Sequence, residues 1–322
     1  MESRAILHLD LDTFFVSVER LKNASLIGKP IIIGGSSNRG VVASCSYETR
    51  KYGVRSAMPM RQALRLCPNA LIIRGDMEGY SKYSNMVTEV INSCAPVVEK
   101  SSIDEFYLDL TGMDRFFGCE LFSKELKQKI TKETGLPISY SLAINKLVSK
   151  IGTNEAKPDG ALYIPQGTEK PFLAPLSVAK IPMVGTETFL RLSSMGVKTI
   201  QTLRQVPVRL LEKEFGKNGV SLAEKANAID HSPVVPYSEQ KSVSTENTFQ
   251  TDTTDIHFLR ECIVSMTEKL AFELRKLKKL TGCVAVKIRY SDFNTYTQQK
   301  TIAYTSNDQL LISVAKELFE KL

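Results

Sequence analysis

The chain has 322 residues, of which 43% are hydrophobic and 24% charged, a composition that excludes global disorder and collagen-like repetition and predicts two or three domains. No stretch approaches the roughly 20 apolar residues of a membrane-spanning helix, and acids interrupt the apolar run at the N-terminus, so we expect no secretory signal and a cytoplasmic, monomeric protein. The net charge of +7 is spread along the chain, which fits either a groove for a phosphate backbone or a merely basic surface.

Strand and helix patterns alternate over the first 165 residues. Periodicity and the positions of Gly and Pro predict strands over 4–11, 30–35 and 136–144, a strand passing into a helix or turn over 41–54, a hairpin over 97–112, and helices over 58–69, 77–94, 116–135 and 144–156. This mixture of helices, strands and hairpin signals predicts an α+β region.

The strand patterns disappear between about 170 and 230, where Gly and Pro separate short helical patterns. These predict helices over 175–185, 186–196, 199–206 and 207–216, and therefore a small all-helical unit. The polar segment 232–243 contains two prolines and is typical of a linker. A second α+β unit is predicted beyond it, with helices over 255–280 and 307–321 and strands over 284–292 and 297–304.

The cysteines and histidines give little support for a zinc site or for nucleophilic catalysis. The six cysteines include no C-x-x-C spacing and have no accompanying histidine cluster, so a zinc site is not expected. The cysteines are instead expected to be reduced and mostly buried. The histidines are His8, His231 and His257, and they lend poor support to a Ser-His-Asp or Cys-His mechanism. If the protein is an enzyme, carboxylates, metals, lysine and arginine are expected to carry its reaction.

Two acids interrupt the first apolar strand. Asp10 and Asp12 lie two residues apart, so their side chains share one face. Acids are costly to bury unpaired, and a divalent cation such as Mg²⁺ would offset that cost. The alternative is that both acids face solvent or meet an arginine.

A second acidic pair, Asp104 and Glu105, immediately precedes a predicted strand. Both could reach one metal pair only if the chain bends there, which Ser101 and Ser102 favour; the alternative is a plain polar turn. An acid on the first strand together with an acidic pair at a hairpin is what a two-metal phosphoryl-transfer site requires. Positioning and electrostatics would then do most of the catalysis.

Two further segments could bind a triphosphate. Tyr47 and Arg50 lie in SYETRKYG, and Lys157 lies in NEAKPDG. An arginine can hold phosphate oxygens with two parallel bonds, whereas a lysine acts as a point charge. The alternative for each residue is an ordinary solvated position on the surface.

Four motifs in a fixed order resemble one family. They are D-x-D-x-F-F from Asp10, SYETRKYGVRSAMP from Ser46, SIDEFYLD from Ser102 and AKPDG from Ala156. Their order and spacing resemble those of the Y-family DNA polymerases, and most of all the bacterial lesion-bypass members. No Walker-type glycine-rich loop is present, which argues against an ATPase.

The resemblance implies an α+β multidomain fold shaped like a right hand. It implies a ferredoxin-like palm at 1–12 and 76–166, small fingers at 13–75, an all-helical thumb at 167–235, a linker at 236–242 and an α+β little finger at 243–322. Family little fingers usually continue into another strand, so the domain is expected to be truncated at Leu322. A sliding clamp is a further implied partner, although no clamp-binding motif is visible.

The family's site residues map onto this sequence position by position. Asp10, Asp104 and Glu105, with the carbonyl of Leu11, match the metal ligands, and the three acids match the catalytic residues, Glu105 above all. Asp12 matches an acid that is not usually a ligand. The dNTP pocket is implied to include Phe14, Phe15, Tyr47, Arg50 and Lys157.

Phe15 matches the steric gate, whose ring would clash with a ribose 2′-hydroxyl, while Phe14 is expected mainly to pack. In the thumb, Met183, Val184 and Gly185 match a helix-hairpin-helix turn whose N–H groups bind DNA phosphate. Met183 replaces the glycine that is usual in the family, which puts the tightness of the turn in question.

The resemblance therefore implies a DNA-directed DNA polymerase that extends a primer on template DNA with dNTPs. Two Mg²⁺ ions, or Mn²⁺ in their place, would assist the transfer, and the family implies low-fidelity translesion synthesis in DNA repair. A non-catalytic DNA-binding scaffold and a nucleotidyl cyclase-like enzyme are the alternatives. The intact carboxylates disfavour the first, and the helical unit with the domain beyond it disfavours the second.

Overall fold

The computed structural model describes residues 4–35, 39–113, 118–236 and 238–322. The chain forms two compact units, Met1–Ser36 with Gly40–Ser238 and Ser37–Arg39 with Glu239–Leu322. Predictions that fall on residues 1–3, 116–117 and 237 lie outside the described residues.

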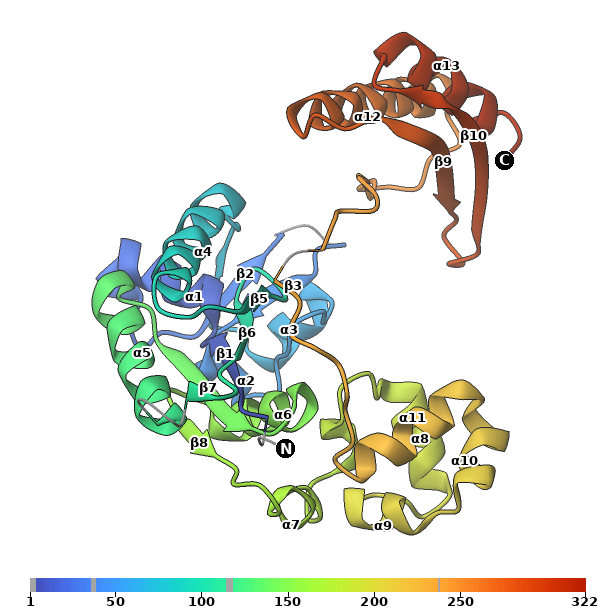
Figure 1. Cartoon of the computed structure of the whole chain (residues 1–322). Helices are drawn as coiled ribbons and strands as arrows, with labels where there is room; N and C mark the ends of the chain where they lie inside the picture. Colours follow the sequence, from blue (N-terminus) through green and yellow to red (C-terminus); the bar gives the residue numbers. More distant parts are fainter. Residues whose placement is uncertain (1–3, 36–38, 114–117, 237) are drawn as a thin grey trace. The chain divides into compact units, whose positions relative to one another are not determined.

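A five-stranded sheet forms the centre of the first unit (Figure 1). The strand order is β5-β6-β1-β7-β8, with antiparallel pairing from β5 to β7 and parallel pairing between β7 and β8. The strands in this order are Val98–Lys100, Glu105–Asp109, Ile6–Leu11, Ile138–Ala143 and Ala161–Tyr163.

Strand β1 is buried on both faces because helices cover both sides of the sheet. One face packs on α4 and α5, and α6 packs over β1 and β7. The β1 residues in the core with α4 and α5 are Leu7, Leu9 and Leu11. His8 and Asp10 alternate with them and so point to the other face. The helices are α4 (Met77–Asn92), α5 (Cys119–Thr134) and α6 (Lys146–Ala156).

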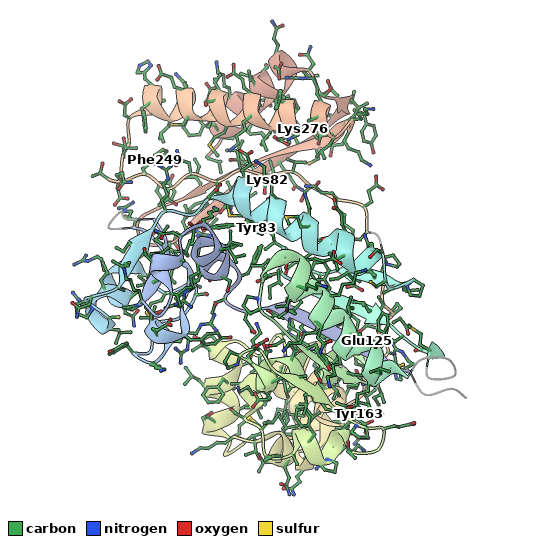
Figure 2. All side chains as sticks on the ribbon, turned by 90° about the vertical axis from the view of Figure 1, so that its left-hand side faces the viewer. Lys82, Tyr83, Glu125, Tyr163, Phe249 and Lys276 are labelled. Carbon is green, nitrogen blue, oxygen red and sulfur yellow. The ribbon has the colours of Figure 1, made fainter. Side chains whose placement is uncertain are left out.

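Local signals explain where these helices begin and end. The Asp76 carboxylate accepts a hydrogen bond from the Gly79 N–H at the start of α4, and Asn145 does the same for Val148 at the start of α6. The left-handed Gly135 (φ 71°) ends α5. The outer faces of α4 and α5 carry exposed polar side chains such as Lys82 and Glu125 (Figure 2).

A smaller sheet, with strand order β3-β2-β4, lies within residues 31–73. Strand β2 pairs antiparallel with β3 and parallel with β4, around a core that includes Ile32, Val42 and Met60. The elements of this part are α1 (Phe14–Lys22), η1 (Ala24–Leu26), β2 (Ile31–Gly34), β3 (Val42–Cys45), α2 (Tyr47–Arg50), α3 (Met60–Leu66) and β4 (Leu71–Ile73).

The remainder of the first unit is helical. Its elements are α7 (Glu169–Leu173), η3 (Val178–Lys180), α8 (Thr186–Ser194), α9 (Ile200–Gln205), α10 (Val208–Phe215) and α11 (Lys217–Ala226). Their buried side chains form one core with Leu147, Val148 and Ile151 of α6. Helix α6 therefore contributes side chains to the core of the helical part and also packs over β1 and β7 of the central sheet.

The second unit is a hairpin covered by helices. Strands β9 (Thr281–Arg289) and β10 (Thr295–Thr305) pair antiparallel, and α13 (Asp308–Phe319) packs on both strands and on α12 (Ile256–Lys276). Val284 and Ile302 of the hairpin contact the buried helical side chains of this unit.

The expected α+β class is confirmed, with strands absent from the described residues between 170 and 230 apart from one isolated bridge, Ser177 with Thr199. The helix predicted over 175–185 is wrong, since only the short η3 forms there. Strands β4 and β8, helices α1, α7 and α11, and the short η1 were not predicted. No helix among the described residues combines the length and the apolar character needed to span a bilayer.

Candidate active site

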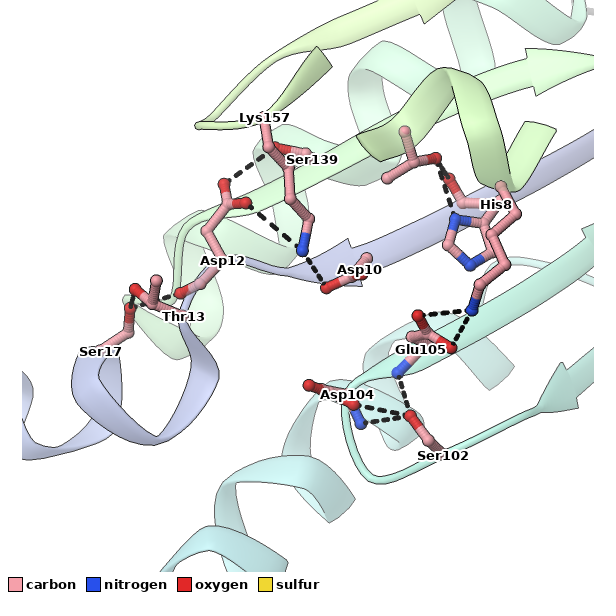
Figure 3. Close-up of polar contacts among 12 residues, drawn as sticks. His8, Asp10, Asp12, Thr13, Ser17, Ser102, Asp104, Glu105, Ser139 and Lys157 are labelled. Carbon is pink, nitrogen blue, oxygen red and sulfur yellow. Dashed lines mark hydrogen bonds and ion pairs between the residues drawn. The ribbon is translucent and has the colours of Figure 1, made fainter. Parts of the chain in front are cut away.

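Strand pairing brings the predicted acids together at one end of the central sheet (Figure 3). Asp10 lies opposite Glu105 in the register of β1 and β6. Asp104 precedes Glu105 in the turn, where its carbonyl accepts the N–H of Leu11 at 3.0 Å. The hydroxyl of Ser102 donates to Asp104 at 2.6 Å and accepts the N–H of Glu105 at 3.1 Å. The turn that the sequence required is therefore present.

Two lysines pair with two of these three carboxylates, those of Asp10 and Glu105. The Nζ of Lys157 donates to Oδ1 of Asp10 at 2.5 Å. Lys150 donates to both carboxylate oxygens of Glu105, at 2.7 and 2.6 Å. Lys150 lies on α6 and Lys157 directly follows it, so one helix supplies cations to both strands.

Asp10 is only 6% exposed, and its pKa is raised to about 7. Burial is the largest cause; the pairing with Lys157 opposes it, and the charges of Glu105 and Asp104 add to it. The three acids are therefore close enough to repel one another. A divalent cation would relieve that repulsion.

Asp12 has a different environment from the other acids. It is 1% exposed and accepts hydrogen bonds from the Tyr47 hydroxyl at 3.2 Å, Ser139 at 2.8 Å and the N–H of Asp159 at 2.6 Å. Lys157 lies 3.9 Å away. These partners make Asp12 an anchor between the sheet, α2 and the segment after α6. Burial, followed by the Asp12 charge, raises the pKa of Tyr47.

Tyr47 and Arg50 lie at opposite ends of the single turn α2. The Arg50 guanidinium carbon lies 5.2 Å from the centre of the Tyr47 ring, and the buried Nε of Arg50 has no hydrogen-bond partner among the described residues. A buried guanidinium N–H without an acceptor can receive an anion.

The two phenylalanines of the first motif differ in environment. Phe14 is 2% exposed and belongs to the core of the central sheet. Phe15 is half-buried and stacks on Tyr80, with ring centres 4.2 Å apart and planes 10° apart. The Tyr80 hydroxyl donates to Glu19 at 2.9 Å.

The predicted DNA-binding turn precedes α8. Met183 has a φ of 76° and is 91% exposed. Val184 donates its N–H to the Ile181 carbonyl at 3.1 Å, and Gly185 is the N-cap of α8 without a side-chain cap. The first N–H groups of α8 thus lack a side-chain acceptor. A φ in the left-handed region explains why glycine suits position 183.

The acids do not hold a ready metal-binding geometry, since no group of three or more potential ligands is arranged for a metal among the described residues. The lysine pairs account for this, because they turn Asp10 and Glu105 towards ammonium groups. The donors are nonetheless all carboxylate oxygens, which suit Mg²⁺. The residues therefore fit a divalent cation once it replaces the lysine charges.

Sequence reasoning missed Lys150, the direct partner of Glu105. A signal was present, since Lys146, Lys150 and Lys157 follow one another at i, i+4 and i+11, a spacing that places them on one face of a helix. It also missed Ser102 and Ser139, whose hydroxyls hold Asp104 and Asp12.

Comparisons with known proteins identify the family of this chain. Models of the impB/mucB/samB family and of its C-terminal domain match residues 9–154 and 240–322, and a DNA polymerase-iota thumb domain model matches 179–226. A DNA polymerase IV of Dehalococcoides mccartyi is 41% identical over 303 residues, covering 93% of this chain and 77% of its own length. One of Listeria monocytogenes is 37% identical, covering 98% and 89%.

The chain belongs to the Y family of DNA polymerases. Two solved Y-family structures agree along almost the whole polymerase, each covering 98% of this chain and 93% of its own. DinB from Sulfolobus solfataricus is 25% identical with a TM-score of 0.68, and a Dbh–Dpo4 chimera is 26% identical with a TM-score of 0.82.

This Y-family polymerase is a DNA-directed DNA polymerase, and its right-hand α+β architecture is the one predicted. The alternative of a non-catalytic scaffold is therefore wrong. The cyclase alternative is wrong as well, because the relatives and solved structures that span the chain are polymerases.

Proposed function

We propose that this polymerase adds dNTPs to a primer 3′-end by two-metal phosphoryl transfer and acts in translesion synthesis. One observation carries the proposal. Asp10 and Glu105 are direct neighbours across β1 and β6, and Asp104 precedes Glu105 in the adjoining turn. Three carboxylates thereby gather at one end of a sheet, and Lys157, one of the residues expected to bind the triphosphate, contacts Asp10.

Asp10, Asp104 and Glu105, with the Leu11 carbonyl, would hold two Mg²⁺ ions, for which Mn²⁺ would substitute. When bound, the ions would lower the pKa of the primer hydroxyl and neutralise charge on the departing pyrophosphate. The residues of the chain would hold these ligands in position. Ser102 fixes Asp104 through a 2.6 Å hydrogen bond, so this carboxylate is held before any ion arrives.

Tyr47, Arg50 and Lys157 would bind the triphosphate. Arg50 has a buried Nε without an acceptor, and Lys157 carries the cation nearest to Asp10. A triphosphate would offer Lys157 an alternative anion. Phe15, supported by Tyr80, would exclude a 2′-hydroxyl, with Phe14 packed behind it. The turn Met183, Val184 and Gly185 would contact a DNA phosphate through main-chain N–H groups other than that of Val184, which bonds to the Ile181 carbonyl.

The domain boundaries remain proposals: palm 1–12 and 76–166, fingers 13–75, thumb 167–235, linker 236–242 and little finger 243–322. A cytoplasmic location, a monomeric state and clamp binding are proposals too, supported by the resemblance to polymerases IV.

Substitution of the acidic pair tests the proposed chemistry. Glu105→Gln and Asp104→Asn keep size but remove charge, so each should lower single-dNTP extension of a primer on the order of a thousandfold. The measurement is the extension rate with Mg²⁺ under single-turnover conditions. Chelation of Mg²⁺ should abolish extension by the unaltered protein.

Glu99→Gln is the matched control. Glu99 also accepts two bonds from a lysine, Lys146, but lies on β5 rather than among the acids. This variant should keep extension within about tenfold of the unaltered rate. Undiminished extension by Glu105→Gln in a correctly folded variant would reject the assignment of the acids.

A further inference from the structure

Lys150 faces two environments at once. Its ammonium donates both bonds to Glu105, and its side chain, about a quarter exposed, lines a cleft of about 430 Å³. Tyr107 and Lys146 of the sheet and α6 line the same cleft, as do Pro182 and Lys225 from the helical part. The ammonium therefore stands between a candidate metal ligand and an open space.

The charge of this cleft depends on Lys150. Lys146 is neutralised by two bonds to Glu99. Lys225 donates a hydrogen bond to the Pro182 carbonyl at 3.1 Å. Because a carbonyl is neutral, this bond leaves the positive charge of Lys225 uncompensated. Two acids, Glu224 and Asp230, also line the cleft, and the N–H of Leu147 that Asp230 accepts at 2.9 Å is a neutral group that does not balance the carboxylate charge. While Lys150 stays on Glu105, these two acids outnumber Lys225 in the cleft. Release of Lys150 from Glu105 would add one positive charge that balances them, which makes the cleft more favourable to an anion than before.

The position of the cleft indicates which anion fits. Pro182 lies on its wall and directly precedes the turn Met183–Gly185, for which we have proposed phosphate contacts. The cleft thus connects that turn to the side of Glu105. An anion that repeats along a chain, as a phosphodiester backbone does, could contact both ends.

We propose that Lys150 is a shared cation, which pairs with Glu105 in the metal-free protein and passes to a backbone phosphate of the bound DNA when a divalent ion takes Glu105. The inference rests on the proposed function, because it assumes that Glu105 binds the ion. Since one ammonium cannot neutralise both anions, metal binding and DNA binding support each other through it. By linkage, DNA must then raise metal affinity by the same factor.

Salt dependence of DNA binding tests this without any catalysis. Each lysine contact to a phosphate adds about 0.9 to the slope of log K against log salt concentration. With saturating Mg²⁺ and no dNTP, the unaltered protein should show a slope steeper by about 0.9 than Lys150→Gln. In EDTA the two slopes should agree, because Lys150 then stays on Glu105. The measurement is anisotropy of a labelled primer–template.

Two variants sharpen the comparison. Lys146→Gln removes a lysine one turn away that remains on Glu99, so any effect on the slope should be the same with Mg²⁺ and with EDTA. Glu105→Gln frees Lys150 without metal and should therefore give the steeper slope already in EDTA. Thermal melting of each variant verifies that it is folded.

Equal slopes for the unaltered protein and Lys150→Gln in Mg²⁺ would overturn the inference, as would a difference of the same size in EDTA. Either result could accompany normal primer extension, which would leave the proposed function intact. Absence of Mg²⁺-dependent extension by the unaltered protein would instead reject the proposed function itself.

Discussion

Phe15 lies flat against Tyr80, with ring planes 10° apart, and Tyr80 is fully buried. A ring stacked on a fixed neighbour keeps its position, and a proposed gate requires a fixed position to separate sugars that differ by one hydroxyl. Discrimination at this site is therefore expected to reside in the Phe15 ring itself.

Phe15→Ala should raise incorporation of rNTPs relative to dNTPs by about a hundredfold, because the ring that would clash with the 2′-hydroxyl is gone. Competing single-nucleotide extensions measure the ratio. Tyr80→Phe is the control, since it keeps the stacked ring and loses only the bond to Glu19. An unchanged sugar preference in Phe15→Ala would rule out this residue as the gate.

The buried His8, beside the lysines of the site, makes the stability of the protein depend on pH. Its ring is completely buried, with Nδ1 2.9 Å from the Thr153 hydroxyl, and its pKa is held well below 6.5, first by burial and then by the charges of Lys150, Lys157 and Lys146. The unfolded chain takes up a proton near pH 6.5 that the folded chain does not. The stability contributed by this difference is present above that pH and is lost as the pH falls.

His8→Asn should therefore flatten the pH dependence of unfolding. Between pH 7 and pH 5 the unaltered protein should lose up to about 1.4 kcal/mol per pH unit more than the variant. Denaturant unfolding in EDTA at several pH values gives this difference. Parallel curves for the two proteins would show that His8 does not titrate on unfolding.

At the scale of elements, the turn before α8 contains a strained residue. Met183 adopts a φ of 76° and is 91% exposed, so it contributes little packing in return for the unfavourable backbone conformation. The departure from the family glycine therefore costs stability while the turn is kept.

Met183→Gly should stabilise the protein by about 0.5–1 kcal/mol, the relief of strain less the greater chain entropy of glycine. Equilibrium unfolding in denaturant measures it. Met183→Ala provides the control, because alanine keeps the strain and should bring no gain. A destabilised Met183→Gly would show that the methionine side chain makes a contribution that its exposure does not suggest.

Elements with strong local signals were predictable, and those that depend on distant partners were not. Strand β1 and the β5–β6 hairpin have alternating patterns and a turn, and their motif acids meet as expected. Helix α11 follows Gly216 and contains Gly219, which weakens its helical pattern; a Cβ on Gly219 would lie 2.0 Å from the Leu211 carbonyl oxygen. A glycine is therefore needed at position 219 because α10 packs closely on α11, and no local sequence pattern reveals that packing.

The candidate site divides in the same way. The positions of Asp10, Asp104 and Glu105 follow from motifs and strand pairing. The pairing of Lys150 with Glu105 requires α6 to lie over the sheet, and only the fold establishes that. Asp12 looked like a possible ligand, but three donors from other segments occupy it.

For the whole molecule, charge predicts how DNA is bound. A net charge of +7 spread along the chain favours contacts to many phosphates over recognition of bases. Affinity for primer–template should fall roughly a thousandfold or more between about 50 and 200 mM salt, and similarly for unrelated sequences. Titrations at several salt concentrations measure this. A flat dependence would point to a partner other than DNA.

Helix α6 contributes Leu147, Val148 and Ile151 to the core of the helical part while its other side covers β1 and β7. A chimera that exchanged only residues 167–235 with those of a relative would separate these helices from the α6 side chains with which they pack. Such chimeras should therefore keep their melting temperature only when Leu147, Val148 and Ile151 of α6 are exchanged together with the helices on which they pack.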